Sequence, residues 1–99
     1  MTTNNKQPYE LTILLDENAT EDDIQRMTDI IKRHGEVTKM DDDGVKRLAY
    51  RIKGHERAHY LFYYLELDTH RYITEELSTN SEVLRYLLVK THNFYGGNR

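Results

Sequence analysis

The stretch AHYLFYYLEL (58–67) constrains the fold most, because taking every second residue divides its apolar side chains into a mainly aliphatic set and an aromatic set. Successive side chains of a β-strand point to opposite faces of the sheet, so every second residue shares a face. One face of this segment carries Leu61, Tyr63, Leu65 and Leu67, and the other carries Tyr60, Phe62 and Tyr64. This pattern predicts a central strand with one face in the core and an exposed row of aromatic side chains on the other.

The remaining segments alternate between strand and helix patterns. Further strands are expected at 9–15, at 36–53 with a turn or bulge at 42–44, and at 82–90. Helices are expected after Thr20 and after Thr69, because apolar residues recur there at helical spacing. The order predicts an α+β, ferredoxin-like βαββαβ fold, a four-stranded antiparallel sheet with two helices on one face. The other face, called the open face below, is then either wet or covered by a partner.

Local signals predict where these elements begin and end. Thr20 and Asp23 have the spacing of a capping box at the start of a helix of about fourteen residues. Gly35 is expected to end that helix as its C′ residue, and Thr69 is expected to cap the second helix. A loop is expected at 54–57.

The 99 residues are enough for one small domain, expected at 8–92 between a disordered tail at 1–7 and a flexible tail at 93–99. The chain starts with no signal peptide and has no apolar run long enough to span a bilayer. It contains no cysteine. We therefore expect a cytoplasmic protein with no membrane contact.

The formal net charge of −3 conceals an uneven distribution. Residues 10–43 contain eleven acidic residues and four basic ones, whereas residues 44–64 contain five basic residues and one acidic residue. Alternation along 45–53 predicts that Leu48, Tyr50 and Ile52 face the core. Arg47, Arg51 and Lys53 then form a basic stripe on the other side, with Arg57 following in the expected loop. Such a patch can bind phosphate, or it can simply keep an edge strand soluble.

The residues provide little support for catalysis, a metal or a cofactor. The sequence lacks a Gly-rich phosphate loop, a nucleophile elbow and a His-Glu-x-x-His motif. His55 and His59 are four residues apart, but they flank a loop-to-strand junction and no third ligand lies nearby. We expect neither enzyme activity nor a metal site.

The composition instead indicates a binding module. Tyr60, Phe62 and Tyr64 could stack on RNA bases while nearby Lys and Arg side chains bind phosphates. Tyr and Arg are also enriched at protein interfaces, so the residues alone leave RNA and protein partners open.

Four segments carry a resemblance to a known family: YELTILL (9–15), GVKRLAYRI (44–52), KGHERAHY (53–60) and EVLRYLLVK (82–90). In this order and spacing, the chain resembles the bacterial small-subunit ribosomal protein six family over about residues 8–92. The resemblance implies a ferredoxin-like, non-enzymatic protein that needs no cofactor. Such a protein binds the central domain of small-subunit ribosomal RNA (rRNA) together with small-subunit ribosomal protein eighteen.

The resemblance also implies roles for individual residues. Tyr9, Arg85 and Lys90 match the family's rRNA-contacting positions, and residues from Arg47 to Arg57 would contact RNA or the partner protein. Two departures stand out, because Gln7-Pro8 replaces basic residues and Arg51 replaces a usual proline. Arg51 retains a backbone N–H that proline lacks, so pairing at a sheet edge can differ.

Two functions therefore remain as hypotheses. The first is a ribosome-associated rRNA-binding protein that is monomeric when isolated. The alternative is a ferredoxin-like protein-interaction or ligand-sensing domain that homodimerises without RNA.

Overall fold

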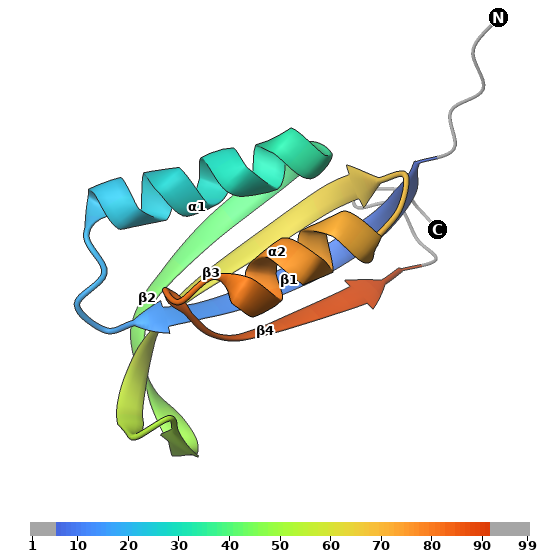
Figure 1. The fold of residues 1–99 in the computed structure, drawn as a ribbon. Helices are drawn as coiled ribbons and strands as arrows, with labels where there is room; N and C mark the ends of the chain where they lie inside the picture. The colour runs from blue at the N-terminus through green and yellow to red at the C-terminus, as the bar shows by residue number, and fades with distance from the viewer. Residues whose placement is uncertain (1–5, 92–99) are drawn as a thin grey trace, which may run out of the picture.

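The computed structural model describes residues 6–91. Its elements in chain order are β1 (Gln7–Asp16), α1 (Glu21–His34), β2 (Glu36–Ile52), β3 (His55–Leu67), α2 (Arg71–Thr79) and β4 (Val83–Lys90). The strands form one sheet in the order β2-β3-β1-β4, and all neighbours are antiparallel. Both helices lie on the same face of the sheet (Figure 1). The predicted ferredoxin-like fold is confirmed.

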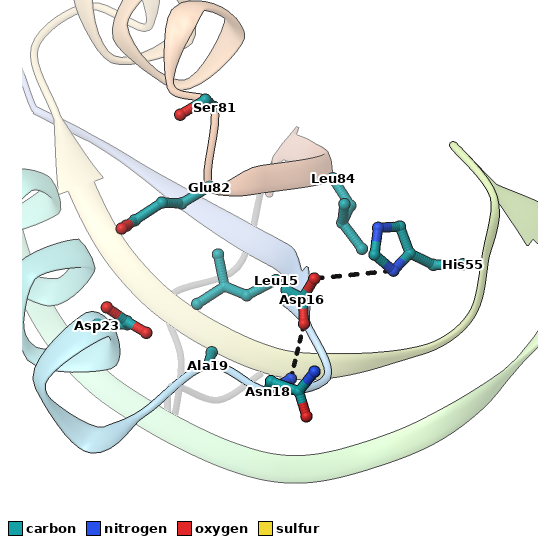
Figure 2. A pocket seen from close by; sticks show the side chains of 9 residues that line it. All are labelled: Leu15, Asp16, Asn18, Ala19, Asp23, His55, Ser81, Glu82 and Leu84. Atoms are coloured by element: carbon teal, nitrogen blue, oxygen red, sulfur yellow. Dashed lines mark hydrogen bonds and ion pairs between the residues drawn. The ribbon is translucent and has the colours of Figure 1, made fainter.

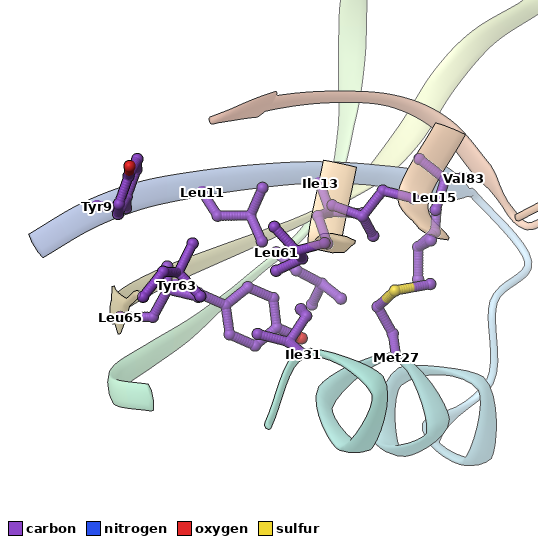
Figure 3. Packing of buried hydrophobic residues seen from close by; sticks show 13 residues of the cluster. Tyr9, Leu11, Ile13, Leu15, Met27, Ile31, Leu61, Tyr63, Leu65 and Val83 are labelled. Carbon is purple, nitrogen blue, oxygen red and sulfur yellow. The ribbon is translucent and has the colours of Figure 1, made fainter. Parts of the chain in front are cut away.

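The helices and the sheet enclose the main hydrophobic core (Figure 3). The strands contribute alternate residues, and the helices contribute one residue per turn or so. The thirteen buried members are Tyr9, Leu11, Ile13, Leu15, Met27, Ile31, Leu61, Tyr63, Leu65, Leu67, Ile73, Leu77 and Val83. The predicted inward face of β3 is therefore confirmed. Burial of apolar surface stabilises a fold by about 25 cal/mol per Å² removed from water, so this cluster is a main source of stability.

The start of α1 is as predicted, but its end is not. Thr20 accepts a hydrogen bond from the Asp23 N–H, and the Asp23 carboxylate accepts one from the Thr20 N–H, which completes the capping box. Gly35 does not adopt the left-handed conformation expected of a C′ glycine, since its φ is −171°. Glycine is needed at this position because the backbones of residues 35 and 66 lie close together, and a Cβ at Gly35 would lie 2.3 Å from the Glu66 carbonyl oxygen.

The cap predicted for α2 is also wrong by one position. His70 is the N-cap residue, and its side chain makes no capping hydrogen bond. The Thr69 hydroxyl accepts instead from the Arg71 N–H, two residues along the chain. Ile73 and Leu77 are buried as expected.

The β2–β3 hairpin extends beyond the part of the sheet that the helices cover (Figure 1). Lys53 and Gly54 both have positive φ, 50° and 83°, and join Ile52 directly to its partner His55. The prediction of a loop at 54–57 is therefore wrong, because residues 55–57 already belong to β3. A two-residue turn with positive φ at both positions matches the twist of the flanking strands, so pairing can resume directly after it. The bulge predicted at 42–44 is confirmed by a register shift there, where Gly44 has a φ of 78°.

The inner residues of the hairpin do not join the main core. Leu48 and Ile52 form a second, smaller cluster with Leu14 and Ala58 on the open face. Tyr50, which alternation places in the core, is 76% exposed. The register between β2 and β3 is interrupted between Arg47 and Ile52, so residues 48–51 are not held in regular pairing with β3. Every second residue of this stretch therefore need not face the core.

The predicted tails lie outside the described residues, except for Lys6 and Gln7, and Gln7 is the first residue of β1. The domain boundaries otherwise remain predictions. Within residues 6–91, neither helix has the length and apolar character required to cross a membrane.

Candidate RNA and partner-protein interface

The predicted basic stripe lies along the protruding hairpin. Arg51 is bound to Glu56 at 2.9 Å, and Arg57 approaches Glu17 at 3.8 Å. Arg47 and Lys53 are exposed, and neither has an ion pair or hydrogen bond to any of residues 6–91. The hairpin therefore presents two engaged and two available cations.

The structure separates the three residues that the resemblance assigns to rRNA contact. In the β1–β4 register Lys90 is opposite Tyr9, and both lie on the face that the helices cover. Arg85 is opposite Leu14 and lies on the open face. Tyr9 is only 8% exposed and its ring packs in the main core, so any contact with RNA has to use its hydroxyl end.

Three cross-strand rows make up the open face. Read from β2 to β4, they are Lys39–Tyr64–Glu10–Val89, Asp41–Phe62–Thr12–Leu87 and Gly44–Tyr60–Leu14–Arg85. The three aromatic residues are half-buried rather than exposed, which corrects the predicted exposed row. Phe62 and Tyr64 pack edge to face at 5.0 Å, and the Lys46 and Lys39 ammonium groups lie 5.4 Å and 5.9 Å from the Tyr60 and Tyr64 ring centres.

An apolar groove on the open face runs between the hairpin and β4. It has a volume of about 260 Å³ and is lined by Thr12, Leu14, Leu48, Ala49, Tyr50, Ile52, Tyr60, Arg85, Tyr86 and Leu87. Leu87 and Val89 on β4 are 61% and 45% exposed, which extends the apolar surface along this edge strand. Sequence reasoning missed this surface, although alternation in VLRYLLVK (83–90) already places Arg85, Leu87 and Val89 on one face.

A second hollow lies on the covered face, where β1 and β4 meet the start of α2. Its volume is about 560 Å³, and Tyr9, His70, Thr74, Tyr86, Leu87, Leu88 and Lys90 line it. The structure thus brings Tyr9 and Lys90 together around one cavity. It adds His70, for which the sequence offers no local signal.

A third cavity, of about 280 Å³, opens where β1 turns into α1, and acidic side chains line it (Figure 2). These carboxylates are already engaged. Arg26 binds Asp23 and also Glu82, the latter at 3.0 Å, and the Asp16 carboxylate lies 3.8 Å from His55. The Thr20 N–H, followed by Thr20 and Arg26 side-chain contacts, lowers the pKa of Asp23. Among residues 6–91 no three His, Asp or Glu side chains are placed to hold a metal ion.

Comparison with known proteins decides the family. The model of the protein family described as "Ribosomal protein S6" matches residues 8–90 of the chain. The chain belongs to the ribosomal protein S6 family. Small ribosomal subunit protein bS6 of Chlamydia felis is 31% identical over 86 residues, covering 84% of this chain and 77% of the relative. The bS6 protein of Rhodospirillum centenum is 31% identical over 96 residues, covering 90% of this chain but only 59% of the relative.

Solved structures agree on the fold. The crystal structure of 30S ribosomal protein S6 from Thermotoga maritima matches with a TM-score of 0.75 at 20% identity. The match covers 87% of this chain and 88% of that one. The resemblance predicted from the four sequence segments is therefore confirmed, and so is the expectation of a non-enzymatic protein, since the family consists of structural ribosomal proteins.

Proposed function

We propose that this chain is a structural component of the small ribosomal subunit that binds the central domain of small-subunit rRNA. It acts by holding RNA phosphates rather than by chemistry, and it does so together with small-subunit ribosomal protein eighteen. Its place is then on cytoplasmic ribosomes. Membership of the ribosomal protein S6 family supports this assignment.

The observation that carries the proposal is the set of unpaired cations. Among residues 6–91, Arg47, Lys53, Arg85 and Lys90 have no ion pair and no hydrogen bond, although all four are exposed. By contrast, Arg26, Arg33, Arg51 and Arg57 are each bound to a carboxylate. A cation that is already paired must give up its partner to bind a phosphate, so the unpaired set is the one available to RNA.

The apolar groove on the open face is the surface on which we expect the protein partner to dock. It combines aliphatic side chains with the exposed Leu87, and buried apolar contact is what stable protein interfaces require at their centre. Because the chain's own net charge is −3, we expect weak RNA binding alone and much tighter binding once the basic partner is docked.

Filter binding of the full chain to a central-domain rRNA fragment, across a salt series, tests the proposal. Replacing Arg85 or Lys90 with alanine should weaken binding and reduce the salt slope by about one phosphate contact each. Lys32→Ala is the matched control, because Lys32 is also an exposed cation with no ion pair to any of residues 6–91, but it lies in the last turn of α1, away from β4. Nanomolar binding at physiological salt without the partner would contradict the expected dependence on it.

Sedimentation of the pure chain separates this function from the alternative. A monomer that co-purifies with small ribosomal subunits supports the proposal. A tight homodimer that ignores RNA would favour the protein-interaction or ligand-sensing domain instead.

A further inference from the structure

The two edges of the sheet differ in how they are protected. β2 and β4 are the outer strands, so each has a row of backbone groups with no neighbouring strand among residues 6–91 (Figure 1). Such a row is a template for another strand, and proteins usually protect it with bulges and charged side chains. Register shifts interrupt the pairing of β2 with β3 at three places, and charged residues lie along β2. The β2 edge is therefore protected by its own structure.

The β4 edge has neither form of protection along its central part. Its pairing with β1 is regular from Arg85 to Lys90, and none of the four residues between them is charged. Leu87 and Val89 are exposed on the open face. A regular, exposed and apolar edge strand is a site where another chain adds to the sheet.

One hydrogen bond shows which backbone groups of β4 point outward. The Thr91 N–H donates to the Pro8 carbonyl oxygen at 3.0 Å, and the β1–β4 register places these two residues opposite each other. In an antiparallel pair, every second residue directs its N–H and C=O groups to the partner strand. Counting back from Thr91, the N–H and C=O groups of Tyr86, Leu88 and Lys90 point away from β1. The edge therefore offers hydrogen-bond donors and acceptors at regular spacing.

The charges on β4 indicate the kind of strand that fits. Arg85 and Lys90 border the uncharged run, and neither has an ion pair to any of residues 6–91. β4 contains no acidic residue, although the whole chain has a net charge of −3. Cross-strand pairs of opposite charge stabilise a sheet, and like charges directly opposite each other destabilise it. A strand with acidic residues at these two positions is therefore complementary to β4, whereas a second copy of β4 has no acid to supply.

We propose that the β4 edge binds an extended segment of another protein, which adds to the sheet as an outer, antiparallel strand. Backbone hydrogen bonds to β4 provide affinity, and alternate side chains provide specificity. Apolar residues of the segment are opposite Leu87 and Val89, in pairs that share no hydrogen bond and whose side chains lie closest. Acidic residues are opposite Arg85 and Lys90.

This inference goes beyond the proposed function, because strand addition requires no RNA. The acidic segment occupies Arg85 and Lys90, the two β4 cations that the proposed function assigns to rRNA. The segment and rRNA are therefore expected to exclude each other, so this partner binds the chain when it is not on the ribosome.

A capped hexapeptide, Glu-Val-Thr-Ile-Thr-Glu, tests the site on the full chain. Antiparallel to β4, its two Glu residues are opposite Lys90 and Arg85, and its Val and Ile are opposite Val89 and Leu87. The same peptide with Lys in place of both Glu residues should bind about tenfold more weakly, because like charges then face each other.

Hydrogen exchange measured by nuclear magnetic resonance shows where the peptide binds. Saturating peptide should slow exchange several-fold at the amides of Tyr86, Leu88 and Lys90, which gain partners. Exchange at Leu87 and Val89 should change little, since those amides already face β1. Only strand addition at this edge produces such an alternating pattern. Absence of protection at millimolar peptide overturns the proposal.

Modified peptides and chain variants provide matched controls. N-methylation of the peptide Thr opposite Leu88 removes a donor to β4 and should weaken binding by roughly tenfold. N-methylation of the Ile opposite Leu87 should change binding by less than about twofold, because that N–H points to solvent. Val89→Thr should weaken binding by about threefold through the loss of one apolar contact. Val45→Thr makes the same change at an exposed position of β2 and should have no effect.

The other occupants of this edge are separate outcomes of the same measurements. Equal binding of the two N-methylated peptides, or protection of β2 amides instead, overturns the strand site. Protection of the β4 amides at high protein concentration without peptide identifies a second copy as the occupant, and protection by a short oligoribonucleotide identifies RNA; either result overturns the proposal. Loss of rRNA binding in the filter assay, with the alternating pattern intact, contradicts the proposed function and leaves this site standing.

Discussion

The two faces of the sheet are built from alternate residues of the same strands, yet they are organised differently. The covered face packs thirteen buried side chains into one cluster with both helices. Among the described residues, the open face has one buried cluster of four residues, Leu14, Leu48, Ile52 and Ala58. Its remaining surface mixes half-buried aromatic rings, exposed aliphatic side chains and the cations Lys39, Lys46 and Arg85. One face thus holds the fold together, and the other leaves its groups available to partners. Period-two alternation allows a single strand to serve both purposes.

Neighbouring residues of β3 test this difference most directly. Leu61 points to the covered face and is fully buried, whereas Phe62 points to the open face and is half-buried. Leu61→Ala should lower the free energy of unfolding by about 3–5 kcal/mol, because a closed cavity remains among residues that cannot all relax. Phe62→Ala should cost less than half as much, although it removes a larger side chain. Urea unfolding measures both, and equal losses would contradict the division of labour between the faces.

A second prediction concerns how closely the covered face is packed. A Cβ at Gly35 would lie 2.3 Å from the Glu66 carbonyl oxygen and 2.6 Å from Leu67 Cδ2, and backbone cannot move aside easily. Gly35→Ala should therefore cost about 2–3 kcal/mol, the upper range for over-packing. Gly44→Ala is the control, since its Cβ meets nothing within 4 Å and only its positive φ resists, at about 1 kcal/mol. If Gly44→Ala proves the more damaging by thermal unfolding, close packing at Gly35 is not the constraint.

The smaller cluster on the open face should yield a more local effect. Leu48 lines the apolar groove, so shortening it to alanine opens the groove further instead of leaving a closed void. The only loss is then the favourable free energy of keeping the methyl and methylene groups of Leu48 out of water, which is about 2 kcal/mol. Hydrogen exchange should accelerate in hairpin residues 45–57 before it does in β1. Tyr50→Ala, at an exposed position, should leave both stability and exchange almost unchanged.

Residues whose environment is set by local pattern were predictable from the sequence. The inward face of β3, the capping box at Thr20 and the bulge at Gly44 depend on neighbours in the chain, and all three are confirmed. Tyr50 was not predictable, because its exposure depends on where pairing between β2 and β3 lapses. Gly35 was misread for a related reason, since its constraint comes from Glu66 of β3, 31 residues further along the chain.

The candidate site divides in the same way. The sequence placed the basic residues of the hairpin on one strand, but it could not show which of them are neutralised. Arg51 and Arg57 are engaged by Glu56 and Glu17, while Arg47 is not. Likewise, the hollow that Tyr9, His70 and Lys90 line joins β1, the start of α2 and β4, which are distant in the chain, so the sequence could not show that these residues lie together.

The smallest expected effect is a pH dependence that originates on the covered face. Burial raises the pKa of Tyr63 above its ordinary value of 10.0, the hydrogen bond between Thr28 and Tyr63 opposes this shift, and repulsion from Asp42 adds to it. The unfolded chain therefore loses this proton first as the pH rises. Stability is fully present below about pH 10 and declines from there toward the higher pKa of the folded state.

Tyr63→Phe isolates that contribution. At pH 7 the variant should lose about 0.5–1.5 kcal/mol, because the 2.8 Å hydrogen bond with Thr28 disappears. Between pH 9 and about pH 11, however, its free energy of unfolding should fall less steeply than that of the parent chain, so the two curves converge. Urea titrations at each pH measure these slopes. Parallel curves for Tyr63→Phe would mean that the buried phenol ionises as easily in the folded chain as in the unfolded one, and that the covered face is wetter than its packing indicates.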